Sequence, residues 1–278
     1  MPARGLGVTG AVARFLPEFV RELFALITHL GDAGLLLAAV ALCYWFGDRR
    51  EGAFSLAAVL GALALTLALK GLFELPRPPA GLHVGHAGGY GFPSGHAIGA
   101  TTLWGLLALV LERGSPHRRA VAAASVVAVV ATSRLVIGVH YAVDVAVGVV
   151  VALVYLGALL RIADWNPTRA FAVAAGLTAA ALATNGLTPD SVATLAGVVG
   201  AAAAWAALGA LDARPRGAVT LPAAAVGLGA LGLVGYAGNR PDLSLAAVFG
   251  LNLLVPAGIL LLPSLVERAR RSRSASPT

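Results

Sequence analysis

A histidine and an aspartate four residues apart stand out in a part of the sequence that is otherwise apolar. The stretch Ser133–Asp144 reads S-R-L-V-I-G-V-H-Y-A-V-D and lies between two long apolar runs. Ionisable groups at the end of a membrane helix are costly, so they usually face a partner, a cavity or a substrate. His140 and Asp144 share one helix face, so the carboxylate can accept from one imidazole nitrogen and leave the other as base or nucleophile. A structural His–Asp pair beside a snorkelling Arg134 is the alternative interpretation.

Two further polar groups precede this stretch. The first contains the only lysine of the chain, separated by six residues from an arginine; its members are Lys70, Arg77 and Pro78. The second opens an apolar run; its members are Pro93, Ser94, Gly95 and His96. Taken singly, each group has a plainer interpretation, the first as a snorkelling lysine with a loop and the second as a helix N-cap. Together and in this order, the three groups indicate one site.

The elements that must position these residues are membrane helices. The chain has 278 residues, of which 58% are hydrophobic and 12% are charged, whereas soluble domains carry about a quarter charged residues. Its mean hydropathy is +0.84, and its apolar runs approach the ~20 residues that cross a bilayer core of ~30 Å. The runs are continuous rather than alternating, which indicates helices. The sequence therefore predicts an all-α, polytopic helical membrane protein and excludes a soluble globular one. The single Cys43 excludes an internal disulfide.

The apolar segments divide the chain into two parts. In residues 1–162 we expect six segments, at about 10–30, 33–47, 52–74, 95–111, 118–136 and 140–160. In residues 163–278 we expect four more, at about 169–184, 191–210, 219–236 and 243–264, followed by a basic tail. The first segment has apolar residues at helical spacing and fits either a short span or a helix lying in the membrane interface. It does not have the pattern of a signal peptide.

The arginines indicate which end of each helix faces the cytoplasm. If the loop 75–93 faces outward, most basic residues lie on the opposite face, as the positive-inside rule requires. They are Arg49, Arg50, Arg113, Arg118, Arg119, Arg161, Arg169, Arg214, Arg216, Arg268, Arg270, Arg271 and Arg273. The outer face then holds Arg240 together with Lys70, Arg77 and Arg134, while the N-terminal arginines are ambiguous. We therefore expect the three polar groups to face outward and the C-terminal tail to be cytoplasmic. The net charge of +7 reflects these arginines, and no nucleic-acid partner is expected.

This topology brings three cations, two histidines and a helix N-terminus to one membrane face. Such a set forms an anion site, for which a phosphate group is the natural ligand. Ser94 and the backbone N–H groups at Gly95 and His96 add hydrogen-bond donors, and Gly95 lets a ligand approach the backbone closely. No carboxylate cluster suited to Mg²⁺ lies on this face, and three fixed cations can replace a metal, so neither a metal nor another cofactor is expected. His83 and His86 lack a third metal ligand, so we expect them to line the mouth of the site.

In these three polar groups the sequence resembles the type 2 phosphatidic acid phosphatase superfamily. This group includes lipid phosphate phosphatases, polyprenyl pyrophosphate phosphatases and, in soluble form, vanadium haloperoxidases. The resemblance rests on the three signature motifs Lys70-(six residues)-Arg77-Pro78, Pro93-Ser94-Gly95-His96 and Ser133-Arg134-(five residues)-His140-(three residues)-Asp144. It covers roughly residues 10–162 and implies a membrane phosphatase core in residues 1–162. The additional helices and the basic tail in 163–278 lie outside this core.

The resemblance also implies a role for each motif residue. His140 would attack the phosphorus and form a phosphohistidine, with Asp144 orienting its imidazole. His96 would protonate the leaving oxygen and then activate the water that cleaves the intermediate. The remaining residues would bind the equatorial phosphate oxygens; they are Lys70, Arg77, Ser94, Gly95 and Arg134.

The sequence thus predicts a membrane lipid phosphatase that acts on a lipid phosphate or diphosphate. Polyprenyl pyrophosphate is the first choice of substrate and a phosphatidate-like lipid the second, because the glycine-rich outer loop suits a bulky amphiphile. A headgroup phosphotransferase of the same family is the alternative within the enzyme class. A transporter would place polar residues at mid-membrane depth, and a vanadate-dependent haloperoxidase would be soluble. The partners expected are membrane lipids and the lipid substrate, and the oligomeric state is left open.

Overall fold

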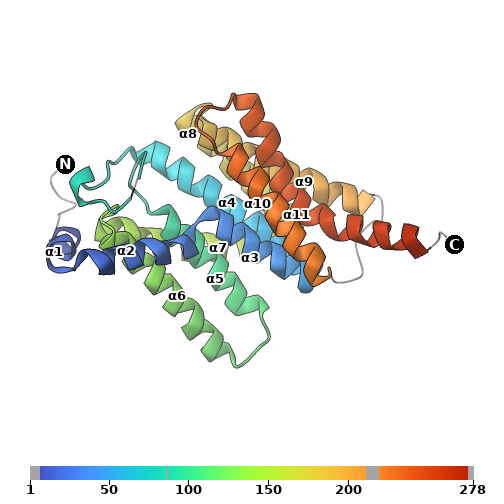
Figure 1. The fold of residues 1–278 in the computed structure, drawn as a ribbon, viewed down its shortest axis with the longest axis horizontal. Helices are drawn as coiled ribbons and strands as arrows, with labels where there is room; N and C mark the ends of the chain where they lie inside the picture. Colours follow the sequence, from blue (N-terminus) through green and yellow to red (C-terminus); the bar gives the residue numbers. More distant parts are fainter. Residues whose placement is uncertain (1–6, 86, 211–218, 275–278) are drawn as a thin grey trace.

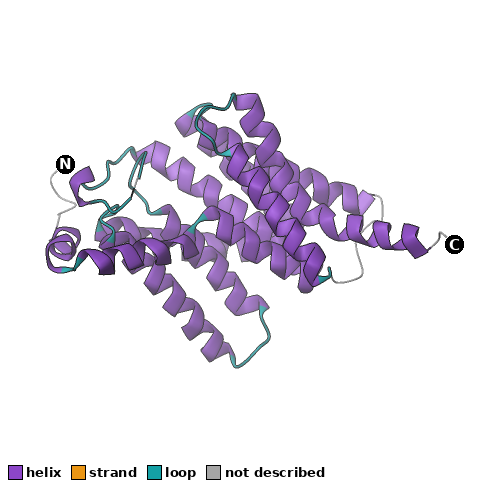
Figure 2. Cartoon of the chain, in the orientation of Figure 1, coloured by secondary structure: helices purple, strands orange, loops and turns teal. Residues whose placement is uncertain are grey.

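A computed structural model describes residues 7–85, 87–210 and 219–274, and within these ranges it contains helices and loops but no strand (Figure 2). The prediction of an all-α fold is confirmed. The α-helices are α1 (Gly7–Phe15), α2 (Glu18–Ile27), α3 (Ala33–Phe46), α4 (Arg49–Phe73), α5 (Gly95–Val110), α6 (Pro116–Val136), α7 (Ala142–Ala163), α8 (Pro167–Asn185), α9 (Pro189–Ala210), α10 (Leu221–Gly238) and α11 (Leu245–Ser274). Two short 3₁₀ helices, η2 (Thr28–Gly31) and η3 (Ala80–Leu82), lie in the connections.

Helix α4 is the buried centre of the bundle. It begins where the Asp48 side chain accepts hydrogen bonds from the backbone N–H groups of Arg50 and Glu51, at 2.8 and 2.9 Å, which is the usual N-cap arrangement. Its apolar residues are buried nearly all round, from Gly52 to Ala68, as expected for a helix without a polar face. It packs against α3, α5, α8 and α9 (Figure 1). It ends at Glu74, which has a left-handed backbone conformation.

In the part of the chain that the structure describes, six helices are long and apolar enough to cross a membrane by themselves: α4, α6, α7, α9, α10 and α11. Helix α5 has 16 residues, and at 1.5 Å per residue it covers only ~24 Å. Helix α8 carries Arg169, three threonines and Asn185, which lower its hydropathy. The ten expected segments therefore all form helices, but not all of them qualify as spans. Among the described residues four helices follow residue 163, and how many of them cross the bilayer stays a prediction.

The N-terminal segment, whose placement the sequence left open, forms two short helices and a bend. Helix α2 has ten residues and no buried side chain, and at ~15 Å it is too short to cross the bilayer by itself. The pair Glu18–Gly31 and Ala33–Phe46 qualifies as one span only together, with a 47° bend between its parts. The apolar side chains Phe15, Phe19 and Leu26 are 83%, 70% and 68% exposed. This is the exposure expected of a helix whose apolar face contacts lipid.

The four C-terminal helices pack directly on the earlier ones and share their core. Helix α8 lies along α4, α9 packs against α11, and α10 and α11 contact α3 (Figure 1). The indole Nε1 of Trp45 in α3 donates a hydrogen bond to the carbonyl of Ile259 in α11 at 2.8 Å. One contiguous cluster of buried residues includes side chains from both parts of the chain. The basic tail is not a separate segment, because α11 continues through it to Ser274.

Several residues used in the sequence analysis lie outside the described ranges. They are His86, Arg214, Arg216 and, of the N-terminal arginines, Arg4.

The connection between α6 and α7 turns at Gly138, where φ is +77°. A Cβ atom at this position would lie 2.0 Å from the carbonyl oxygen of Leu82. The neighbouring backbone is tied to the same loop, because the Val84 N–H donates to the carbonyl of Ile137 at 2.9 Å. Only glycine tolerates both this conformation and this close approach.

We therefore expect Gly138→Ala to destabilise the protein by roughly 3 kcal/mol or more, from a strained backbone and a steric clash together. Gly114→Ala is the matched control, because Gly114 has φ +82° and nothing within 4 Å of a built Cβ. It should cost only the backbone strain, about 1–2 kcal/mol. Thermal unfolding in detergent measures both variants. Equal losses would show that the contact with Leu82 does not matter.

Candidate active site

The turn between α6 and α7 buries His140 and Asp144 almost completely, with 1% and 0% exposure. The imidazole Nδ1 of His140 lies 3.5 Å from Oδ2 of Asp144. The same carboxylate oxygen accepts a hydrogen bond from the backbone N–H of Tyr141 at 2.9 Å. Thr9 of α1 donates its hydroxyl to the carbonyl of His140 at 3.0 Å. The two side chains thus form the predicted pair, and backbone contacts on both sides hold them in place.

Arg77 occupies the other side of the imidazole. Its Nη1 lies 3.1 Å from Nε2 of His140 and also donates to the carbonyl of Val139 at 3.1 Å. Its Nε donates to the carbonyls of Gly88 and Gly89 at 3.0 and 3.2 Å. The guanidinium therefore joins the loop after α4 to the turn before α7.

These contacts determine the protonation state of His140. Burial, together with the positive charge of Arg77, lowers the pKa of His140 to about 3, against the raising effect of Asp144. The imidazole is therefore neutral at physiological pH. Because a guanidinium can only donate, Nε2 must be the acceptor and Nδ1 must carry the proton, toward Asp144. The lone pair of Nε2 then points at the Arg77 guanidinium, a group that can bind a phosphate.

Lys70 and Arg134 complete a group of three cations with Arg77. All three interact electrostatically with His140. Arg134 is only 7% exposed, and its Nη1 donates to the Thr28 hydroxyl at 2.6 Å. Its Nε is buried without a hydrogen-bond partner among the described residues. Buried polar atoms nearly always have partners, so this unpaired donor is available to a ligand.

The start of α5 lies against the same turn. The backbone N–H of Ser94 donates to the carbonyl of Asp144 at 2.9 Å, and its hydroxyl oxygen accepts from the Ala97 N–H at 3.5 Å. Ser94 is thus the N-cap of α5, the plainer interpretation, and its hydroxyl proton is still available to a ligand. A Cβ at Gly95 would lie 2.9 Å from the Thr66 side chain, so the close packing of α5 on α4 also requires glycine.

His96 has a partner that the sequence analysis missed. Its Nε2 lies 2.7 Å from Oδ1 of Asp32, whose Oδ2 lies 2.5 Å from Nδ1 of His29. Asp32 stands at the bend between η2 and α3. The only signal in the sequence was an ionisable residue between two apolar segments, and 64 positions separate it from His96. Thr28, the partner of Arg134, was missed because 106 positions separate the two residues.

The loop between α4 and α5 contacts the turn before α7. Nε2 of His83 lies 2.9 Å from the carbonyl of Pro78 and donates to it, so this nitrogen is not available as a metal ligand. Arg21 of α2 donates to the carbonyl of Val136 at 3.2 Å and also to that of Leu82. Within the described ranges, no group of three His, Cys, Asp or Glu side chains is arranged to hold a metal ion.

The structure thus brings the predicted site residues to one end of the bundle. His140, Asp144, Arg77 and Ser94 are joined by the contacts above. Lys70 and Arg134 interact electrostatically with both His140 and His96. The positions of these residues relative to one another permit a phosphate group to be held by three cations between the two histidines.

Comparison with known proteins agrees with this geometry. Residues 51–168 match the family description "PAP2 superfamily". Phosphatidylglycerophosphatase B of Bacillus subtilis (strain 168) is 30% identical over 148 residues, which cover 50% of this chain and 72% of the relative.

Two solved structures are similar to this one. The first transmembrane PAP2 type phosphatidylglycerolphosphate phosphatase from Bacillus subtilis has a TM-score of 0.49 and 23% identity, and the match covers 55% of this chain and 80% of that one. Aquifex aeolicus LpxE has a TM-score of 0.49 and 20% identity, with 57% and 96% covered. From the family match and the identity with the Bacillus subtilis phosphatase, together with the three motifs, we conclude that this chain belongs to the PAP2 superfamily, the type 2 phosphatidic acid phosphatases.

Proposed function

We propose that this integral membrane protein is a lipid phosphatase that works through a phosphohistidine intermediate. One observation carries the proposal: a buried, neutral imidazole has its Nε2 directed at Arg77, with Asp144 next to its other nitrogen. A nucleophile backed by a carboxylate and directed at a phosphate-binding cation is the arrangement that phosphoryl transfer requires.

In the first step, Nε2 of His140 attacks the phosphorus and the bond from phosphorus to the ester oxygen breaks. His96 donates a proton to that leaving oxygen, so the lipid departs as an alcohol or, from a diphosphate, as the monophosphate. The imidazole of His140 becomes cationic, and Asp144 next to Nδ1 stabilises this charge, as carboxylates do for catalytic histidines.

In the second step, His96 takes a proton from a water molecule, whose oxygen attacks the phosphohistidine. The bond between phosphorus and Nε2 breaks, inorganic phosphate leaves, and both histidines return to their starting states. Lys70, Arg77 and Arg134 stabilise the charge on the equatorial oxygens in both steps. Each cation contributes about 2.7–4 kcal/mol if it acts like one oxyanion-hole donor.

The substrate we propose is a lipid with a terminal phosphate or diphosphate. The relatives named above include a phosphatidylglycerophosphatase, which acts by its name on a glycerolipid phosphate. Helix α2 contacts the loop next to the site through Arg21, and its exposed apolar residues suit a substrate that arrives within the bilayer. Polyprenyl pyrophosphate and phosphatidate-like lipids therefore remain the two classes to compare, in that order. We also propose residues 1–162 as the catalytic core, with residues 163–278 as an addition to it.

His140→Ala should lower kcat by about 10⁴-fold or more, as in other enzymes that lose their nucleophile. No labelled phosphoenzyme should remain after acid quenching of this variant. Arg134→Ala should lower kcat/KM by about 10²–10³-fold through the loss of one cation. Arg161→Ala is the control, because Arg161 is exposed at the far end of α7. Labelled phosphate trapped on any residue other than His140 would overturn the assignment.

Asp32→Asn should slow phosphoenzyme formation from an alkyl phosphate by about 10²-fold, because Asp32 positions the acid His96 and a general acid contributes at least that much. A nitrophenyl phosphate should be much less affected, since its leaving group needs no proton. His29→Ala leaves the contact between Asp32 and His96 in place and should not alter this dependence on the leaving group. Pre-steady-state phosphorylation measures both substrates. Equal losses on the two would reduce Asp32 to a structural role.

We further propose that the site faces the outside of the cell, because the basic residues concentrate at the opposite ends of the helices. In a Cys43→Ala background, Ala80→Cys should react with a membrane-impermeant maleimide in intact cells. His117→Cys should react only after the cells are opened. Both positions are exposed, one in the loop over the site and the other at the start of α6. The reverse labelling pattern would show that the site faces the cytoplasm.

A further inference from the structure

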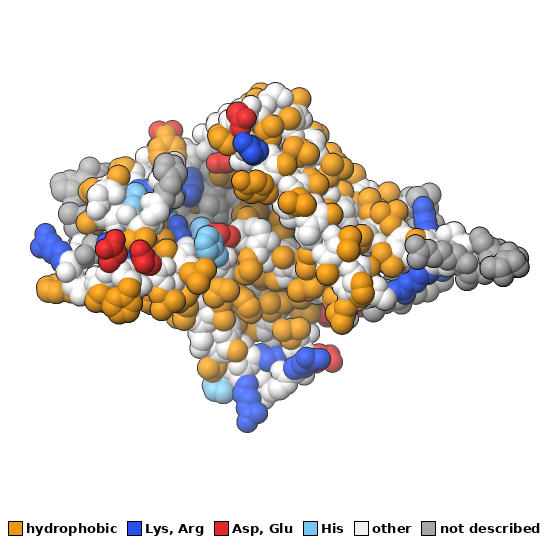
Figure 3. All heavy atoms as spheres, viewed as in Figure 1, with side chains coloured by type: hydrophobic (Ala, Val, Ile, Leu, Met, Phe, Trp, Pro, Cys, Tyr) orange, Lys and Arg blue, Asp and Glu red, His pale blue; other side chains and the backbone are white. Residues whose placement is uncertain are grey.

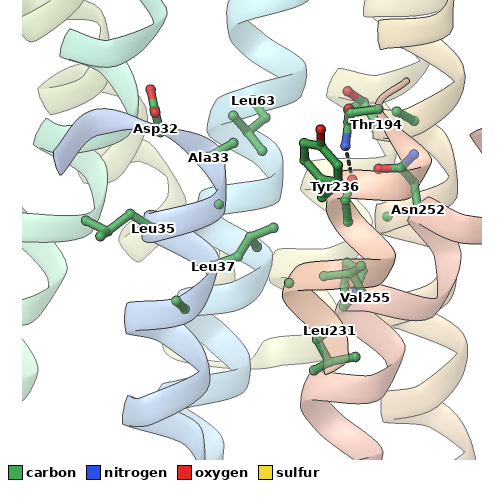
Figure 4. A pocket seen from close by; sticks show the side chains of 18 of the residues that line it. Asp32, Ala33, Leu35, Leu37, Leu63, Thr194, Leu231, Tyr236, Asn252 and Val255 are labelled. Carbon is green, nitrogen blue, oxygen red and sulfur yellow. Dashed lines mark hydrogen bonds between the residues drawn. The ribbon is translucent and has the colours of Figure 1, made fainter. Parts of the chain in front are cut away.

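A second feature of the molecule is a cavity of about 1060 Å³ that the proposed chemistry does not use. Its walls come from α3 and α4 on one side and from α9, α10 and α11 on the other (Figure 4). Figure 3 shows the molecular surface hollowed between the N-terminal helices and α10–α11. The cavity therefore lies between the catalytic core and the C-terminal helices, and neither part forms it alone.

The lining of the cavity changes from polar to apolar along its length. Figure 4 shows Asp32, Thr194, Tyr236 and Asn252 at one end, and aliphatic side chains such as Leu231 toward the other. Apolar walls with a few polar groups at one end are typical of sites for amphiphilic ligands.

The polar end adjoins the active site at three points. Asp32 lines the cavity and contacts His96 at 2.7 Å. Thr66 lines the cavity and packs against the backbone of Gly95. Asp190, a third lining residue, interacts electrostatically with Lys70. A molecule held at the three cations could therefore extend from them into the cavity.

The charges at this end are largely balanced among themselves. The Asp32 carboxylate contacts two histidines, and Arg240 lies 3.8 Å from Asp242. The apolar end carries no charged residue among the described lining residues. An anionic headgroup would thus favour the three cations, and only a hydrocarbon chain would favour the deeper part.

The depth of the cavity matches one leaflet of a bilayer. Its lining runs along α3 from Asp32 to Ala41, which at 1.5 Å per residue is roughly 14 Å. This is about half of a ~30 Å hydrocarbon core. A chain that enters beside the active site would therefore lie at the depth it already occupies in the membrane.

We propose that this cavity binds the hydrocarbon chain of the lipid phosphate substrate while the phosphate lies at the three cations. The proposal rests on the proposed phosphatase function and deepens it. Because α9, α10 and α11 lie beyond the residues that match the family, this chain site belongs to the additional helices. Their function is then to select substrates by their tails.

Gly232 and Gly229 of α10 provide a matched pair of variants. Both have nothing within 4 Å of a built Cβ, but Gly232 lines the cavity and Gly229 is not among its lining residues. Gly232→Phe should place a ring in the cavity without a clash. Gly229→Phe should also avoid a clash, but its ring should lie outside the cavity. Gly235→Phe is a second cavity variant, since its built Cβ meets only Val255 at 3.6 Å.

The experiment compares kcat/KM for a long-chain lipid phosphate with that for a short-chain, water-soluble phosphate ester, using the full-length protein in detergent. Gly232→Phe should lower the ratio of the two by about tenfold, which corresponds to about two methylene groups kept out of the cavity. Gly235→Phe should act in the same direction. Gly229→Phe should leave the ratio unchanged. Thermal unfolding of each variant is measured in parallel.

Each other outcome overturns the proposal in a distinct way. An unchanged ratio in both cavity variants, with a lowered Tm, would assign the cavity to a structural lipid. An equal fall in Gly229→Phe would show an effect of added bulk on the helix rather than on the cavity. If the wild-type protein hydrolyses the short ester but no lipid phosphate, the proposed function fails as well.

Discussion

The contact between Arg77 and Nε2 of His140 is the interaction on which the rest of the structure depends. It exists only because the imidazole is neutral, and the imidazole is neutral because it is fully buried beside cations. A protonated His140 would repel Arg77, Lys70 and Arg134 at once. The site therefore favours an anion, and the proposed phosphate group would supply one next to Nε2 of His140.

Placing three cations together at a membrane helix end is unfavourable, and the surrounding structure supplies the compensation. Backbone carbonyls of the loop between α4 and α5 accept from Arg77, and the Thr28 hydroxyl accepts from Arg134. Helix α1 contacts the His140 backbone, and α2 contacts both the outer loop and the end of α6. The N-terminal helices are thus part of the site, because without them buried donors would lose their partners.

The C-terminal helices extend this arrangement rather than standing apart from it. The core is contiguous across residue 162, and the cavity between the two parts has a wall from each. Since α3 begins at the bend that carries Asp32, the residue that contacts His96 also lines one end of the cavity. Catalysis and tail binding would therefore be coupled through α3.

The sequence by itself determined the helical class and the position of nearly every helix, and it proposed a set of candidate site residues. It could do so because continuous apolar runs have one stable form in a bilayer, and because ionisable residues among them are rare enough to be noticed. Lys70, Arg77 and Arg134 were identified on that ground. The same physics explains why Ser94 was ambiguous: an N-cap and a ligand-binding hydroxyl look alike in sequence.

Only the tertiary structure decided which side chains meet. The pairing of Asp32 with His96, and of Thr28 with Arg134, joins helices that are far apart in the chain. The bend after α2 and the cavity between α3 and α10 also depend on how distant helices pack together. Helices such as α4 are apolar on every face, so no amphipathic stripe indicates which side packs against which neighbour. Glycine and alanine faces allow several close packings, and only the packed bundle shows which one the chain adopts.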